Sequence, residues 1–228
     1  MAPPIVTATL QTALISAFSN VLAQAITAHQ SSTPFTIDPI PLAQYTLFAL
    51  LSTPPNFLWQ ETLESAFPSY RIAPTAEALA SAAASDDAAL DDESARGALV
   101  EPQLSKRNTL AKFVLDQTLG AAVNTLLFSL FMHGVREGMA HHYDVAGKGK
   151  GAWGFVAGGD VVRYEAVEWV GVWAKARGEF WGLVRAGWRF WPVVSLVNYG
   201  FVKSVEARSL VGALAGLAWG VYLSLVMG

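Results

Sequence analysis

Several uncharged, hydrophobic segments of this chain contain polar side chains that could bind or conduct a small polar solute. They are hydroxyl and amide groups and one carboxylate: Thr12, Ser16, Asn20, Gln24, Asp116, Gln117, Asn124 and Asn198. Burying such groups in lipid without hydrogen-bonding partners is costly. We therefore expect them to face one another, or water, inside a bundle of helices.

The run from Thr12 to Gln24 places a polar residue at every fourth position, which forms a stripe on one face of a helix. The stripe has no charge, whereas helices that lie on a membrane surface usually carry Lys or Arg on their polar face. We therefore favour a spanning helix whose stripe turns into a bundle. A surface amphipathic helix is the alternative.

Asp116 is the carboxylate of the third hydrophobic segment, and Lys112 lies one helical turn before it. The simpler interpretation is a carboxylate near the membrane interface, paired with that lysine. The alternative is an ionisable group at membrane depth that faces a cavity or a partner helix. In a pore, such a group would favour cations or repel anions at one mouth.

The residue patterns of an enzyme or a metal site are missing from the sequence. It contains no cysteine, which excludes thiolate nucleophiles and thiolate metal ligands. Neither a GxSxG motif nor a Walker loop occurs. His141, His142 and Asp144 form a single short cluster without a fourth ligand. We expect no catalysis, no cofactor and no metal, and the net charge of −3 argues against a nucleic-acid partner.

Composition and patterning predict an integral membrane protein. Charged residues make up only 14% of the chain, and the mean hydropathy is +0.35. Strong hydrophobic segments occupy residues 5–28, 42–60, 113–133 and 209–227, and a shorter one occupies 190–202. About 20 apolar residues suffice to cross a bilayer. We predict an all-α, polytopic transmembrane helix bundle with about four spanning helices, in a single membrane domain covering residues 1–228.

The segments between these runs differ in character. Residues 73–105 are acidic and poor in large apolar side chains, which predicts a flexible, solvated loop. Residues 134–160 contain interleaved Gly and Lys, which is typical of a linker. Pro54 and Pro55 should kink or break the second hydrophobic segment near its end. The tryptophan-rich segment 164–191 is amphipathic, and we expect it to lie along the membrane interface.

Small residues recur every four positions in the last hydrophobic segment, at Gly212, Gly216, Gly220 and Ser224. They form a ridge along one face of a helix, and such ridges allow close helix packing in lipid. The ridge would join helices within one chain or between copies, so a homo-oligomer is an open alternative.

A further set of residues has the identities and spacing of a family signature. It comprises Pro54, Trp59, Trp188, Trp191, Pro192, Asn198, Tyr199, Arg208, Trp219, Tyr222, Leu223 and Ser224, together with the Asp116-Gln117 pair. With these residues the chain resembles the Mpv17/PMP22 family of small peroxisomal and mitochondrial inner-membrane proteins. It departs from the family pattern at Ser19-Asn20, where Gly-Asp is usual, and it lacks the proline usual after Asp-Gln.

The resemblance implies a four-span protein of the mitochondrial inner membrane or the peroxisomal membrane. Members of the family are described as weakly selective channels for small solutes that support organelle homeostasis. The expected partners are therefore the lipid bilayer and small solutes. The alternative is a non-conducting, structural or scaffolding membrane protein, in which the same polar groups form interhelical hydrogen bonds of about 1 kcal/mol each.

Overall fold

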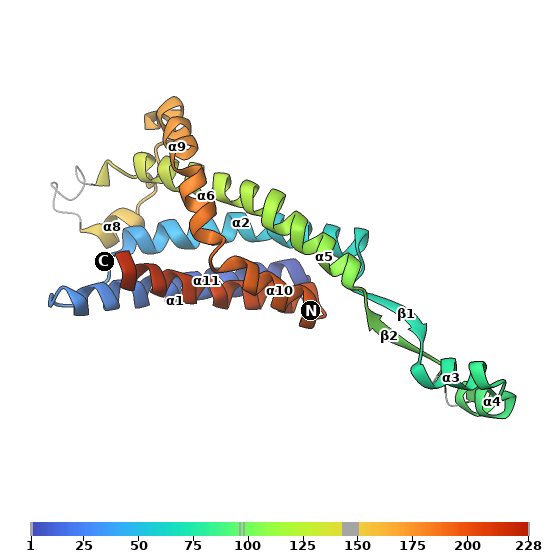
Figure 1. The fold of residues 1–228 in the computed structure, drawn as a ribbon. Coiled ribbons are helices and arrows are strands. Elements are labelled where there is room, and N and C mark those ends of the chain that lie inside the picture. The colour runs from blue at the N-terminus through green and yellow to red at the C-terminus, as the bar shows by residue number, and fades with distance from the viewer. Residues whose placement is uncertain (1, 96, 98, 143–150, 228) are drawn as a thin grey trace.

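Long helices lie side by side in the computed structural model, and a thin projection extends from one end of the bundle (Figure 1). The structure describes residues 2–95, 97, 99–142 and 151–227, with backbone alone for residue 93 and residues 220–227. The bundle contains α1 (Pro4–Gln30), α2 (Pro39–Ala66), α5 (Lys106–Leu115), η1 (Asp116–Gly120), α6 (Ala121–Gly138), α9 (Trp169–Gly187), α10 (Trp191–Phe201) and α11 (Val205–Met227). Short helices α8 (Ala152–Val156) and η2 (Tyr164–Ala166) connect α6 to α9. The predicted all-helical bundle is confirmed as a mostly helical fold.

Helices α1, α2 and α11 pack together along the length of the bundle. Asp38 caps the start of α2 by accepting a 2.9 Å hydrogen bond from the Ile40 amide. The predicted break at Pro54 and Pro55 is absent, because α2 continues through both prolines. The hydroxyl of Thr53 donates a 2.6 Å hydrogen bond to the Ala49 carbonyl, within the turn that precedes them.

The third hydrophobic segment lies in a continuous helical path from α5 through η1 to α6. Its central turn, η1, is π-helical, a rare geometry that often occurs at functional sites. Within the described residues, two helical paths are long and apolar enough to cross a membrane, namely Pro4–Gln30 and Lys106–Gly138. The predicted segments 42–60 and 209–227 lie within the long helices α2 and α11. The count of four spans stays a prediction.

The outside of the bundle is apolar. Large hydrophobic side chains on several helices are exposed, including Leu14, Phe18, Leu51, Val193 and Phe201. A water-soluble protein rarely exposes so many, whereas a lipid-facing surface requires them. A small hydrophobic cluster of Ile40, Val135, Met139 and Phe155 is buried at the end of the bundle opposite the projection.

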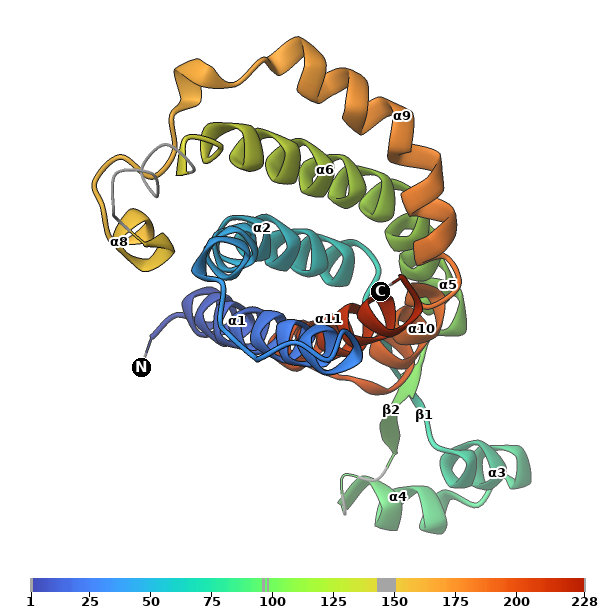
Figure 2. The same ribbon diagram turned by 90° about the vertical axis from the view of Figure 1, so that its left-hand side faces the viewer.

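Helix α9 runs beside α6 (Figures 1 and 2). Near its start, the Trp169 ring lies against Gly134, and just after its end the Trp188 indole donates a 3.1 Å hydrogen bond to the Gln117 carbonyl. Those two contacts are about 25 Å apart along the long helix, at 1.5 Å per residue. The interfacial position of α9 stays a prediction.

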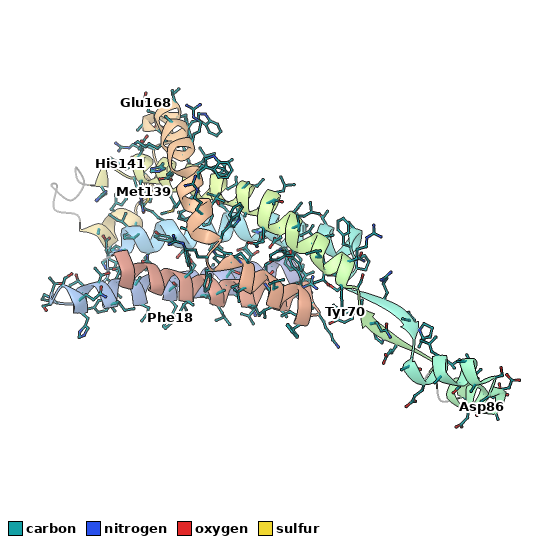
Figure 3. All side chains as sticks on the ribbon, viewed as in Figure 1. Phe18, Tyr70, Asp86, Met139, His141 and Glu168 are labelled. Atoms are coloured by element: carbon teal, nitrogen blue, oxygen red, sulfur yellow. The ribbon has the colours of Figure 1, made fainter. Side chains whose placement is uncertain are left out.

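The acidic segment, for which the sequence predicts a flexible loop with transient helix, contains two strands and two short helices. Strands β1 (Tyr70–Pro74) and β2 (Val100–Leu104) pair antiparallel, with Tyr70 opposite Leu104. Helices α3 (Ala76–Ala84) and α4 (Asp87–Ala95) form the tip. We call residues 70–104 the projection. Asp86 marks its far end and Tyr70 its junction with the bundle (Figure 3).

Candidate functional site

Charged and polar side chains are buried together at the end of the bundle that carries the projection. They come from α2, α5, η1, α10 and α11 and from the turn before β1. Two adjoining groups can be distinguished. The Glu64 cluster consists of Glu64, Ser69, Lys112 and Arg208. The Asp116 cluster consists of Gln60, Asp116, Gln117, Ser195 and Tyr199.

One carboxylate in the Glu64 cluster accepts hydrogen bonds from two cations. Its Oε2 atom lies 2.6 Å from Lys112 Nζ and 2.5 Å from Arg208 Nη1. Both cations are withdrawn from solvent, with exposed side-chain fractions of 0% for Lys112 and 1% for Arg208. Ser69 completes the cluster, since its backbone amide donates to Glu64 Oε1 at 2.7 Å and its hydroxyl accepts from both cations.

Additional contacts offset the cost of burying these charges. Arg208 Nε donates to the carbonyl oxygens of Val202 at 3.0 Å and Asn198 at 3.3 Å. The Tyr199 ring lies 5.2 Å from Lys112 Nζ and 5.4 Å from Arg208 Cζ, within the range of cation–π attraction. A buried ion pair needs such extra contacts, because desolvation alone can exceed the attraction between the charges.

Glu64 lies beyond the predicted hydrophobic segment 42–60. Its protonation state depends on its burial and on its hydrogen-bonding partners. Burial raises the pKa of the Glu64 carboxyl, since it penalises the charged form. Hydrogen bonds from Lys112, the Ser69 amide and Arg208 lower that pKa by more, to about 2. Glu64 is therefore a carboxylate throughout the physiological range.

The Asp116 cluster is a chain of hydrogen bonds between helices. Asp116 accepts from Gln60 Nε2 at 3.2 Å and from Ser195 Oγ at 3.0 Å. The Tyr199 hydroxyl donates to Gln60 Oε1 at 2.9 Å. Because Gln60 lies one turn before Glu64 on α2, and Tyr199 borders both clusters, the two groups form one connected network.

Three buried polar atoms in or next to the two clusters have no hydrogen-bond partner among the described residues. They are Trp59 Nε1, Gln117 Oε1 and Asn198 Oδ1. Gly120 allows the Trp59 indole to approach, because a Cβ atom at this position would lie 2.9 Å from Trp59 Nε1 and 3.3 Å from Asp116 Oδ1. The hydrogen-bonding capacity of these atoms is open to water or to a small polar solute.

The structure corrects the predicted partner of Lys112. Its ammonium pairs with Glu64, so the predicted Lys112–Asp116 ion pair is wrong. Glu64 competes successfully because it also accepts from Arg208 and Ser69, whereas Asp116 is hydrogen-bonded by Gln60 and Ser195.

The predicted polar stripe of α1 faces α2 rather than the network. Ser16 Oγ donates to the Tyr45 carbonyl at 3.1 Å. Gln24 bonds to Asn20 at 2.8 Å and to both the amide and the carbonyl of Asp38, at 2.7 and 2.9 Å. Thr12 is half-buried on the same helix. These groups therefore join two neighbouring helices.

Other predicted residues lie away from the network. Asn124 is exposed on α6. A Cβ atom at Gly212 or Gly216 would meet no heavy atom within 4 Å, so these glycines do not make the expected close packing within the chain. Of the remaining signature and ridge positions, Gly220, Tyr222, Leu223 and Ser224 lie outside the described side chains.

Most remaining signature residues surround the network. Asn198 Nδ2 donates to the Arg208 carbonyl at 3.4 Å, and the Trp219 ring stacks on Phe190 with 5.4 Å between centroids. Glu64, Ser69, Gln60 and Ser195 were missed at the sequence level. The available signal was the four-residue spacing of Gln60 and Glu64, which places both on one face of α2 directly after an uncharged run.

Within the parts of the chain that the structure describes, no group of three His, Cys, Asp or Glu side chains lies close enough to hold a metal ion. The network instead contains cationic and neutral hydrogen-bond donors together with anionic and neutral acceptors. Such a set of groups can bind a polar solute.

The region that supplies Ser195, Asn198, Tyr199 and Arg208 also matches a known family. Residues 164–224 match the model of the Mpv17/PMP22 family. The C-terminal region is similar to that of Mpv17/PMP22 proteins. The predicted resemblance is thereby confirmed, and members of this family are organelle membrane proteins.

Two relatives are similar to a part of this chain. PXMP2/4 family protein 3 of Dictyostelium discoideum is 44% identical over 43 residues, which is 19% of this chain and 23% of the relative. Protein SYM1 of Yarrowia lipolytica is 30% identical over 53 residues, or 23% of this chain and 26% of the relative. The chain thus matches about a quarter of the length of each relative. No solved structure matches.

Proposed function

We propose that this protein forms a weakly selective pore for small polar solutes in an organelle membrane, either the mitochondrial inner membrane or the peroxisomal membrane. Its role would be to support the homeostasis of that organelle. The observation that carries the proposal is the set of buried, unpartnered polar atoms in and next to the two clusters: Trp59 Nε1, Gln117 Oε1 and Asn198 Oδ1.

These atoms favour a hydrated path for a physical reason. Buried polar groups in folded proteins nearly always have a partner, and one without a protein partner usually binds water. Here they come from α2, η1 and α10, so the path would run between those helices. The π-helical turn at Asp116–Gly120 supports the same location, since such turns are frequent at functional sites.

The charges of the network make a prediction about selectivity. Glu64 balances only one of the two positive charges of Lys112 and Arg208, whereas Asp116 is bonded by the uncharged Gln60, Ser195 and Gln117. The two clusters together are neutral, and the charge closest to Gln117 is the carboxylate of Asp116. A path lined in this way would conduct small polar solutes and prefer cations over anions.

A non-conducting, structural membrane protein is the second candidate. It is favoured by hydrogen bonds that polar side chains make with one another, such as Gln24 with Asn20 and Gln60 with Asp116. In that function the network would hold the helices together and no solute would pass.

Conductance measurements on the purified full chain in planar bilayers distinguish the two. We expect reproducible conductance with a cation preference, and Asp116→Asn should abolish that preference. Asn124→Ala is the matched control, because Asn124 is a polar residue of the same helical path that is exposed. Silent bilayers, with the protein shown to be folded by circular dichroism, would contradict the pore and support the structural function.

A further inference from the structure

The outer face of α9 carries positive charge that nothing in the described structure neutralises. Arg177, Arg185 and Arg189 are exposed, and none forms an ion pair within the described parts of the chain. The acidic side chain within the helix points elsewhere, since Glu179 accepts from Ser129 and lies 3.0 Å from His133 Nε2 on α6. The arginine face is therefore open to an anionic partner.

Tryptophans are interleaved with these arginines. Trp173, Arg177, Trp181 and Arg185 follow one another at every fourth position, and Trp188 continues the series. The three tryptophans are exposed, with Trp181 at 60%. Exposed Trp beside Arg is typical of the depth at which lipid headgroups meet acyl chains, because Trp has an apolar body and a polar edge.

A shallow, mainly apolar groove of about 350 Å³ lies directly beside the end of α9. It is lined by Phe113, Val114, Gln117, Thr118, Trp188 and Pro192. Trp188 forms one wall, and its hydrogen bond to the Gln117 carbonyl holds the indole in place. Arg185 lies one turn before Trp188 and Arg189 directly follows it, so the groove and two arginines adjoin.

The depth of the groove suits a lipid. Phe113 and Val114 are the first residues of the hydrophobic segment 113–133, where the hydrocarbon core would begin. A groove at this level would receive the upper part of an acyl chain. Arg185 and Arg189 would then lie near the phosphate layer, which the long arginine side chain can reach by extending along the surface.

We propose that Arg185, Arg189 and the groove bind one anionic phospholipid of the surrounding membrane. The guanidinium groups hold the headgroup phosphate, for which their planar geometry is well suited. The groove between Phe113, Thr118 and Trp188 holds the start of an acyl chain. Lipid binding at this site does not require that the protein conduct solutes. The lipid site and the pore are therefore tested independently.

Lipid titration of the full chain in detergent, followed by native mass spectrometry, tests the site. We expect phosphatidylglycerol to bind more tightly than phosphatidylcholine. Arg185→Gln and Arg189→Gln should each weaken phosphatidylglycerol binding about fivefold, which is the contribution of one basic residue near an anionic lipid surface. Thr118→Trp should reduce lipid binding by filling the groove, since Thr118 is exposed and tolerates a larger side chain there.

Arg177→Gln is the matched control, because Arg177 has the same charge on the same helix but lies two turns from Arg185 and away from the groove. It should leave phosphatidylglycerol binding unchanged. Equal affinity for the two lipids, or an equal loss in all three arginine variants, would overturn the proposal. So would displacement of phosphatidylglycerol by millimolar inorganic phosphate, which would identify a site for free anions.

Discussion

The Glu64 cluster and the projection both contain many charges, but the two regions treat them in opposite ways. In the cluster, Lys112 and Arg208 are withdrawn from solvent and share one carboxylate. The projection carries seven acidic residues against two basic ones between Tyr70 and Leu104, and all the acidic side chains that the structure describes there are exposed. Charge density alone therefore does not locate the important part of this molecule.

The difference lies in desolvation. Exposed charges are screened by water and salt, so their interactions contribute little to stability. Buried charges lose their hydration, and each then depends on its remaining partners. Substitutions should consequently have large effects in the cluster and small effects in the projection.

The largest effect is expected for Glu64→Gln. The variant leaves Lys112 and Arg208 buried together without a carboxylate, and breaking a buried ion pair costs about 3–5 kcal/mol. Thermal unfolding in detergent measures the loss. Glu61→Gln, an exposed carboxylate on the same helix, should melt like the original chain. Equal melting of the two variants would show that the cluster does not stabilise the bundle.

An intermediate effect is expected for Gly120→Ala, which tests packing in the Asp116 cluster. The added methyl group would lie 2.9 Å from Trp59 Nε1, so the indole or the helix must move, at a cost of about 1–3 kcal/mol. Gly216→Ala is the control, because its methyl group meets no atom within 4 Å. The control should be neutral or stabilising, as Ala favours helix over Gly by about 1 kcal/mol. A higher melting temperature for both variants would contradict this close approach.

The smallest effect is expected when the tip of the projection is removed. Residues 76–98 would be replaced by Asn-Gly, which closes a two-residue hairpin between Thr75 and Leu99, whose backbones are already hydrogen-bonded at 3.1 Å. Bundle stability should change by less than about 1 kcal/mol, as judged by thermal unfolding in detergent. A loss comparable to that of Glu64→Gln would mean that the tip is an integral part of the bundle.

The helical architecture was predictable from the sequence because long apolar runs leave few alternatives in lipid. The importance of Asp116 was also predictable, since a carboxylate in such a run needs a partner. Its actual partners were not, because Gln60 and Ser195 lie 56 and 79 residues away along the chain. Spacing rules compare residues within one helix, and on that basis Lys112 was the natural choice.

Two other expectations show what a sequence pattern leaves open. An amphipathic pattern shows that α9 has an apolar face, and it does not distinguish a membrane surface from α6 as the neighbour of that face. Likewise, the glycine ridge of α11 predicts close approach within the chain or between copies, and Gly212 and Gly216 have no such neighbour among the described residues. In both cases the sequence specifies a surface, and tertiary packing decides what lies against it.

The contact between Glu64 and Arg208 joins positions 144 residues apart, so it bears on the order of assembly. A ribosome delivers α2 and α5 well before α11, which means that Glu64 and Lys112 can meet as a neutral pair while the rest of the chain is still being made. Arg208 arrives last as an additional cation, and it can be accommodated only by a carboxylate that is already in place. Helix α11 therefore inserts against a prepared acceptor, and a nascent chain that has lost Glu64 would leave Lys112 without its carboxylate before α11 is made.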